Sequence, residues 1–268
     1  EWHAATGQWT NPFEVLGTQA GARFGSAVAI DGDFAVIGAP FYDDTASAEM
    51  NEGGAFVYLR SGPGNAWTTD PLAQLRPDEM GVYDGYTGGE FGRAVGISMP
   101  YIAVGAPASG GASRATPDGS GRGYIYDQGG VANRWDGPTF RVAARNGTTG
   151  NSVPGARFGS AVAIHRDLLV VGAPDEDVSV EAGAGRAYIY SRSASGNDWT
   201  TSATVDIDAT LGPDGPQAGA GFGSSVDVIN DTTDWVAAGA PSATELGGAT
   251  VGAGAVFVFD GIGTYKAG

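Results

Sequence analysis

The chain has 268 residues, no cysteine and two histidines, and its 30 acidic and 14 basic residues give a net charge of −16. These numbers exclude a disulfide scaffold, a zinc finger, a thiol nucleophile and a multi-histidine metal site. The acidic surface repels phosphate backbones and anionic lipids, and the apolar runs are far shorter than a membrane span, so neither nucleic acid binding nor membrane insertion is expected.

Four segments of the chain share one pattern, in which a Phe-Gly pair opens an apolar strand and a Gly-Ala-Pro closes the next one. The phenylalanines lie 67, 67 and 64 residues apart. The predicted first strands lie within 24–30, 91–97, 158–164 and 222–228, and the predicted second strands within 34–40, 101–107, 168–174 and 235–241. Self-similarity at a fixed period predicts a repeat architecture.

Each repeat continues with a third predicted strand of alternating aromatic and β-branched residues, at 56–58, 124–126, 188–190 and 257–259. A fourth predicted strand is marked by a tryptophan in the first three repeats: Trp67 leads to Leu75, Trp135 to Val142 and Trp199 to Val205. Period-two alternation is typical of strands, and no window keeps the 3.6-residue period of a helix. The sequence therefore predicts an all-β protein.

The fourth repeat has no tryptophan strand after it, and the missing piece lies at the other end of the chain. Residues 8–16 match residues 65–72 in type and spacing. We therefore predict one domain over 1–268, a closed four-bladed β-propeller of four-stranded antiparallel blades, in which the strand from Trp9 to Leu16 completes the last blade and leaves no open edge. The repeats cover about 18–76, 77–143, 144–206, and 207–268 together with 1–17. A piece of a longer array, or a ring built from two chains, has the same signature.

These motifs resemble the Phe-Gly/Gly-Ala-Pro (FG-GAP) repeat family, known from the propeller of integrin alpha subunits and from many microbial surface and secreted proteins. Both halves of the motif occur in all four repeats. The resemblance implies an extracellular or cell-surface, secreted protein that serves as a non-enzymatic recognition or adhesion module.

One departure from the integrin-type repeat concerns calcium. Such repeats often carry an Asp-rich calcium loop between strands 1 and 2, but here three of these connections are only about three residues long, too short to wrap a cation that needs six to eight oxygens. The chain resembles the calcium-loop-free microbial and algal variant. We expect no required cofactor, and expect any Ca²⁺ to bind weakly at the face described next.

Propeller geometry places the long connections between strands 2 and 3, and between strands 4 and 1, on one face. We call it the long-loop face. Its acidic and aromatic residues are the candidate ligand-binding set: Tyr42, Asp43, Asp44, Tyr83, Asp84, Tyr86, Asp175 and Asp177. Clustered carboxylates suit Ca²⁺, which selects Asp43, Asp44, Asp175 and Asp177 as candidate metal ligands. The alternative is that Asp satisfies backbone N–H groups where the chain turns, and that the tyrosines pack the loops.

Arginines also flank the Phe-Gly pairs, at Arg23, Arg93 and Arg157. They are interpreted either as an anion site or as partners of loop carboxylates, and the second interpretation is favoured. The recurrent tryptophans are predicted to pack between blades, and His165 is expected to be solvated in a hairpin turn. Asn146 and Asn230 begin glycosylation sequons.

Residue types give little support for catalysis, because no nucleophile elbow or phosphate-binding loop occurs. We expect a non-enzymatic module that binds a glycan or an extracellular protein through the long-loop face. The alternative is a structural subunit of an extracellular coat or filament that binds copies of itself. A glycoside-acting enzyme, which needs only two carboxylates, is the remote alternative.

Overall fold

The computed structural model describes residues 2–3, 7–9, 13–44, 50–62, 66–79, 82–83, 86–111, 113, 115–128, 135, 138–142, 153–192, 199–200, 205–211, 215–231, 233–244, 252–260 and 264–265. Within these residues it contains 20 β-strands and one short 3-10 helix, Ala209–Leu211. No helix in this part of the chain is long and apolar enough to cross a membrane. The predicted all-β class is confirmed.

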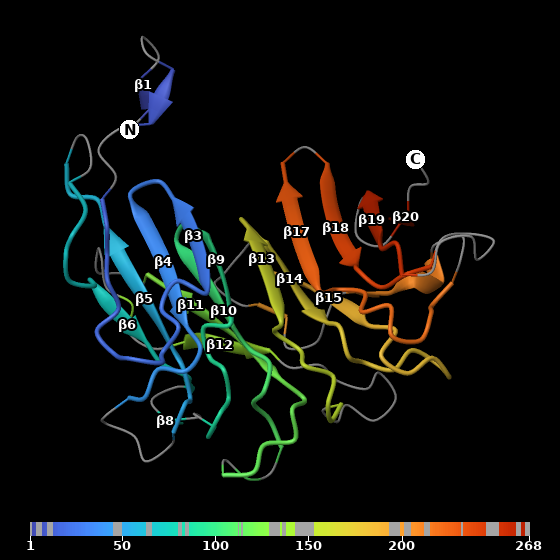
Figure 1. Cartoon of the computed structure of the whole chain (residues 1–268). Coiled ribbons are helices and arrows are strands. Elements are labelled where there is room, and N and C mark those ends of the chain that lie inside the picture. Colours follow the sequence, from blue (N-terminus) through green and yellow to red (C-terminus); the bar gives the residue numbers. More distant parts are fainter. Residues whose placement is uncertain are drawn as a thin grey trace.

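Four antiparallel four-stranded sheets account for most of the strands (Figure 1). Sheet 1 contains β3 (Ala27–Asp31), β4 (Phe34–Ala39), β5 (Gly54–Leu59) and β6 (Ala73–Leu75). Sheet 2 contains β9 (Ala94–Ser98), β10 (Tyr101–Ala106), β11 (Arg122–Asp127) and β12 (Pro138–Val142). Sheet 3 contains β13 (Ala161–His165), β14 (Leu168–Ala173), β15 (Arg186–Ser191) and β16 (Val205–Ile207). Sheet 4 contains β17 (Ser225–Asn230), β18 (Asp234–Ala240), β19 (Ala255–Asp260) and β20 (Thr264–Tyr265).

Two small pairs complete the set: β1 (Trp2–His3) with β2 (Gln8–Trp9), and β7 (Asp78–Glu79) with β8 (Val82–Tyr83). Each sheet follows one predicted repeat. The second strands β10 and β14 are buried at all six positions, as expected for consecutive apolar residues covered on both faces.

The four sheets pack in series through their first strands, β3 against β9, β9 against β13 and β13 against β17. Figure 1 shows this order from blue to red, with the strand 1–2 hairpins toward the top and the long connections toward the bottom. A separate apolar core fills each of the three junctions. The Phe-Gly phenylalanines Phe91, Phe158 and Phe222 lie in these cores and are at most 1% exposed. The predicted tryptophan packing is seen in the same junctions, where Trp135 contacts Phe34 and Trp199 contacts Tyr101 edge-on.

At the hairpin edge, a backbone N–H of each later sheet also donates a hydrogen bond to a side chain of the preceding sheet. The N–H of Met99 donates to Asp31 Oδ2 (2.8 Å), that of Arg166 to Ser98 Oγ (2.9 Å), and that of Asn230 to His165 Nδ1 (2.8 Å). His165 was expected to be solvated in a hairpin turn. It instead ends strand β13, and its half-buried ring accepts a hydrogen bond from the next sheet.

The fourth sheet differs from the predicted closure. Strand β20 pairs with Phe259 and Asp260, at one end of β19, whereas β6 pairs with Ala55–Val57, farther back along β5. The corresponding stretch of β19, 256–258, has no fourth strand among the described residues. Trp9 pairs with Trp2 and not with sheet 4, because a hairpin of neighbouring residues closes a much shorter loop than a pairing of opposite chain ends.

The two ends of the series are exposed. Val28 and Ile30 of β3 are 70% and 66% exposed, and Val256 of β19 is 72% exposed, while Val95, which corresponds to Val28, is 9% exposed. The described residues thus form an open series of four sheets, in which no strand of sheet 4 packs on sheet 1 as the first strands of neighbouring sheets pack on each other.

Candidate functional site

The long connections at one edge of the sheets begin in the same way in all four repeats. Two residues after each Gly-Ala-Pro, a backbone N–H donates to the alanine carbonyl, at 3.1 to 3.2 Å, and the carbonyl of the same residue accepts from a later glycine N–H. This repeated position is occupied by Tyr42, Ser109, Glu176 and Ala243. The scaffold therefore holds one backbone geometry and presents a different side chain from each sheet.

The predicted acids of sheet 1, Asp43 and Asp44, contact residues of the loops around them. The Asp43 carboxylate accepts a hydrogen bond from the Asn51 N–H, and the Asp43 backbone is held by both ends of the Gln19 amide. Asp44 is buried and forms an ion pair with Arg76, with 2.7 Å between Arg76 Nε and Asp44 Oδ2. The Asp43 contact matches the turn-stabilising alternative, whereas Asp44 pairs with an arginine of a different connection.

The predicted acids of sheet 3 are exposed and lie on a different connection. Asp175 lies 3.7 Å from Arg157 Nε, and Asp177 Oδ1 accepts from the Gly183 N–H at 2.9 Å. No group of three or more His, Cys, Asp or Glu side chains arranged for a metal occurs among the described residues. The structure gives these acids contacts with their own loops and with Arg157.

The predicted aromatic ligands are packed. Tyr42 contacts Phe56 edge-on, with ring centroids 5.2 Å apart. Tyr86 is 5% exposed, its hydroxyl donates to the Gly111 carbonyl, and the Arg122 guanidinium lies 4.6 Å above its ring. Tyr83 lies in β8, while Asp84 and the sequon residue Asn146 lie outside the described residues. Asn230 ends strand β17.

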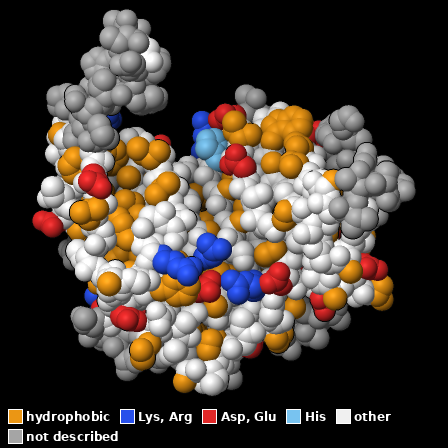
Figure 2. Space-filling view, in the orientation of Figure 1, with side chains coloured by type: hydrophobic (Ala, Val, Ile, Leu, Met, Phe, Trp, Pro, Cys, Tyr) orange, Lys and Arg blue, Asp and Glu red, His pale blue; other side chains and the backbone are white. Residues whose placement is uncertain are grey.

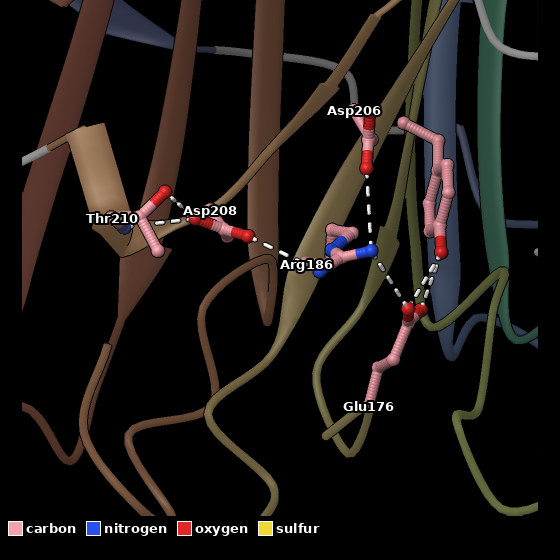
Figure 3. Close-up of polar contacts among 6 residues, drawn as sticks. Glu176, Arg186, Asp206, Asp208 and Thr210 are labelled. Atoms are coloured by element: carbon pink, nitrogen blue, oxygen red, sulfur yellow. Dashed lines mark hydrogen bonds and ion pairs between the residues drawn. The ribbon is translucent and has the colours of Figure 1, made fainter. Parts of the chain in front are cut away.

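The long-loop side of sheet 3 holds a polar network that sequence reasoning missed (Figure 3). Glu176, 3% exposed, accepts hydrogen bonds from the Tyr188 hydroxyl at 2.7 and 2.6 Å. Arg186 bridges Glu176 (3.4 Å), Asp206 (3.2 Å) and Asp208 (3.3 Å). Asp208 in turn accepts from the Thr210 N–H, at the start of the 3-10 turn, at 2.8 Å. The signal available in the sequence was the acidic residue two positions after Gly-Ala-Pro, where the other repeats have Tyr, Ser or Ala.

The network shifts the titration of its members. Burial raises the pKa of the Glu176 carboxyl above its ordinary value, although the Tyr188 hydrogen bond and Arg186 act in the opposite direction. Burial and the neighbouring Glu176 charge raise the pKa of the Tyr188 hydroxyl, so it stays protonated and donates. Burial lowers the pKa of Arg186, but the Glu176 charge and its neighbours raise it by more. Arg186 therefore remains a cation next to a carboxyl whose pKa is raised.

The Phe-Gly turns carry a second, more exposed set of charges. Arg157 Nη2 lies 3.1 Å from Glu90 Oε2, and Arg93 Nε lies 3.9 Å from the same oxygen. Arg23 stacks on Phe41, 4.7 Å from its ring centroid. The prediction that these arginines pair with loop carboxylates is confirmed for Arg93 and Arg157.

The backbone at these turns is unusual. The residues before Phe24, Phe91 and Phe158, namely Arg23, Glu90 and Arg157, all have φ between 52° and 58°. Non-glycine residues rarely adopt this region, and residues held there concentrate at functional sites. Figure 2 shows basic side chains with acidic ones beside them near the centre of this view. Exposed guanidinium and carboxylate groups of this kind hydrogen-bond to hydroxyl and charged groups of a ligand.

Comparison with known proteins identifies the repeats. A family model described as FG-GAP repeat matches residues 17–58 and 148–190. No curated protein matches the chain. Among solved structures, the chain is similar to the Trypanosoma rangeli sialidase in complex with 2,3-difluorosialic acid, a covalent intermediate, at 12% identity and a TM-score of 0.45. That alignment covers 92% of this chain and 37% of the sialidase chain. The two matched segments, which span the first and third Phe-Gly and Gly-Ala-Pro motifs, are therefore FG-GAP repeats, and the second and fourth repeats make the same backbone hydrogen bonds.

Proposed function

We propose that this chain is an extracellular, non-enzymatic recognition or adhesion module that binds a glycan or a protein through its long-loop face. One observation carries the proposal. The backbone hydrogen bonds at the start of each long connection repeat four times, while the side chain at that position changes from Tyr42 to Ser109, Glu176 and Ala243. A rigid scaffold with differing loop residues is the usual arrangement of a recognition surface.

The charged groups on this face indicate a polar ligand. Arg93 and Arg157 are 51% and 38% exposed at the side chain, and each lies near Glu90. Their ion pairs are solvated and contribute little to stability, so exchanging them for ligand contacts costs little. Hydroxyl and carboxylate groups, common to glycans and protein surfaces, are the groups that such arginines bind.

The test is binding of the intact chain to a glycan array and to a panel of extracellular proteins. We expect Arg93→Ala with Arg157→Ala to lose binding of whatever ligand the wild type captures. Arg60→Ala is the matched control, because Arg60 is similarly exposed (41%) and paired with Asp33, but lies at the opposite, hairpin edge. Equal loss in both variants, or turnover of a fluorogenic glycoside by the wild type, would contradict the proposal.

The four sheets serve in this proposal as the blades of a β-propeller. The closed four-bladed ring predicted from the sequence needs sheets 4 and 1 to meet. The second candidate function, a self-assembling structural subunit, is favoured by the exposed apolar residues at both ends of the series, Val28 and Ile30 on sheet 1 and Val256 on sheet 4.

A further inference from the structure

We propose that the exposed end faces of the series join head to tail, so that sheet 4 of one copy of this chain docks on sheet 1 of a second copy. The proposal goes beyond ligand recognition and does not depend on it, because the faces involved are the sides of the end sheets and not the long-loop face. It commits to a second copy as the partner. Each end sheet carries one half of a junction that the chain already makes three times.

The three internal junctions share one geometry. A Cβ added to the Gly of Gly-Ala-Pro would lie under 3.0 Å from the carbonyl oxygen of the Phe-Gly glycine on the next sheet, for Gly38 with Gly92, Gly105 with Gly159, and Gly172 with Gly223. A second glycine of each sheet forms a parallel β-bridge with the Phe-Gly phenylalanine of the next sheet: Gly53 with Phe91, Gly121 with Phe158 and Gly185 with Phe222. The phenylalanine N–H also donates to a carbonyl of the preceding sheet, at 2.8 to 3.1 Å.

The two end sheets, 1 and 4, carry these same elements, and the described residues place no counterpart against them. A Cβ at Gly25 would meet nothing within 4 Å, while Gly239 and Gly254 face only atoms of their own repeat. A groove of about 660 Å³ lies on sheet 4 beside these residues, lined by Gly239, Ala240, Pro241, Gly254 and Val256 among others. In sheet 3 the corresponding glycines, Gly172 and Gly185, hold Phe222-Gly223. The groove is thus shaped for the Phe24-Gly25 of another sheet 1.

The apolar side chains are matched as well. Val28 and Ile30 correspond to Val95 and Ile97, which pack against sheet 1 in the first junction. Val256 and Val258 correspond to Ala55 and Val57 on the other side of that junction, both 0% exposed. Docking would bury these four residues against each other, as their counterparts are buried in the first junction. The apolar area removed from water would stabilise the association.

The N-terminal segment adds a further complementary feature. In the internal junctions, Leu75, Val142 and Ile207 of the fourth strand pack on the phenylalanine of the next sheet. Val15 and Phe24 both pack on the sheet 1 cluster that contains Phe56 and Tyr58. The end face of sheet 1 therefore already carries an apolar residue of the N-terminal segment, and sheet 4 lacks a fourth strand beside 256–258 among the described residues. The segment around Val15 of one copy would fill that edge in the other.

A second copy fits this arrangement better than closure of the chain on itself. The step from each sheet to the next is set by close glycine–backbone contacts, which leave no room for adjustment. Three such steps leave β3 and β17 apart, so self-closure would have to open the three internal junctions. A second copy brings both halves with their geometry intact, and two head-to-tail contacts related by a twofold axis, or a growing chain of copies, can then form.

One residue departs from the pattern and predicts a weak junction. Asp227 occupies the position held by Ala29, Gly96 and Ala163 in the other repeats, and it is exposed on the side of β17 that faces away from sheet 3. Docking would place its carboxylate against apolar residues. Asp227→Ala should therefore tighten the association at least tenfold.

Sedimentation of the intact chain over a concentration series tests the proposal. We expect species of twice the chain mass or larger, growing with concentration. Val28→Asp and Val256→Asp should each be monomeric, and mixing the two should restore dimers only, because each variant keeps one intact face. Val180→Asp is the matched control, since Val180 is 88% exposed away from both faces and its variant should associate like the wild type. Unchanged circular dichroism in all three variants shows that the fold is intact.

Disulfide cross-linking distinguishes docking on a second copy from closure of the chain on itself. Because the chain has no native cysteine, only introduced cysteines can form the cross-link. Gly96 and Ile164 approach closely across an internal junction, and Asp227 and Ile30 correspond to them. Asp227→Cys and Ile30→Cys in one chain should give disulfide-linked dimers or larger products on a non-reducing gel. A cross-link confined to one chain would overturn the proposal in favour of the closed ring. The proposal would also be overturned by a wild type that stays monomeric, or by Val28→Asp and Val256→Asp variants that still associate.

Discussion

The buried pair Glu176–Tyr188 gives the sharpest test of how the long connections are held. Tyr188→Phe removes a hydroxyl that donates to both carboxylate oxygens of Glu176, at 2.7 and 2.6 Å, and the Glu176 side chain is only 4% exposed. A hydrogen bond to a charged group contributes about 1.5–3 kcal/mol, so the variant should lose about 2 kcal/mol of unfolding free energy. For a domain of this size, that loss lowers Tm by about 4–8 °C.

The chain supplies its own control for this experiment. Sheet 4 has Ala243 and Phe257 at the corresponding positions, and both are buried without a polar pair. Glu176→Ala alone should also destabilise, by about 1–3 kcal/mol, because it leaves the Tyr188 hydroxyl buried without its partner. Glu176→Ala with Tyr188→Phe, which copies sheet 4, should cost at least about 1 kcal/mol less than the sum of the single variants.

Urea unfolding of the four proteins at pH 7, followed by circular dichroism, measures this cycle. The m-values should agree, so that differences in midpoint report stability. Additive single variants, or a Tyr188→Phe variant within about 0.5 kcal/mol of the wild type, would refute the view that the two side chains form one coupled unit.

Three further results are expected. The pKa of Glu176 is raised in the folded state above the unfolded value of 4.5, so its favourable contribution to stability is fully present below pH 4.5 and is lost as pH rises through the raised pKa. In urea unfolding at a series of pH values, the stability of the wild type relative to Glu176→Gln should therefore fall over that window. A difference that does not change with pH would contradict this expectation. Gly172→Ala should lower the unfolding free energy by about 3 kcal/mol, because the added Cβ would collide with a backbone carbonyl. Gly239→Ala should lower it by under about 1 kcal/mol, because its Cβ meets only the flexible Ser225 side chain. Equal losses in the two variants would show that the junction can adjust. Chelation by EDTA should leave Tm unchanged, since the cores between the sheets need no cation, and a collapse of the fold on chelation would show otherwise.

The N-terminal segment shows where sequence comparison succeeds and where it stops. Its likeness to the tryptophan strands predicts a fourth strand, and in the structure Val15 packs on the apolar cluster of sheet 1 that contains Phe56 and Tyr58. Sequence likeness cannot say which sheet edge the segment joins, because every repeat offers a similar edge. The structure pairs Trp9 with Trp2 and leaves the edge at 256–258 unfilled by the described strands.

The sequence by itself determined the strands, their order and the residues between sheets. These features follow from local alternation, turn residues and the repeat period, which act over a few residues and are copied four times. The repeated Phe-Gly pairs mark Phe91, Phe158 and Phe222 as equivalent positions, and all three are 0–1% exposed in the cores between sheets. The arginine–carboxylate pairing at the Phe-Gly turns was also predictable from composition and position.

Only the tertiary structure decided the roles of the individual acids and the state of the ends. The formal charges of Asp44 and Asp175 are the same, yet one is buried against Arg76 and the other is exposed near Arg157. Glu176 meets Tyr188 and Arg186, and Arg186 meets Asp206, because β15 and β16 lie beside the end of β14 in one sheet, which no spacing in the sequence encodes. Whether Val28 and Val256 are covered depends on the angle between successive sheets, and that angle is set by close backbone contacts at glycines rather than by any local pattern.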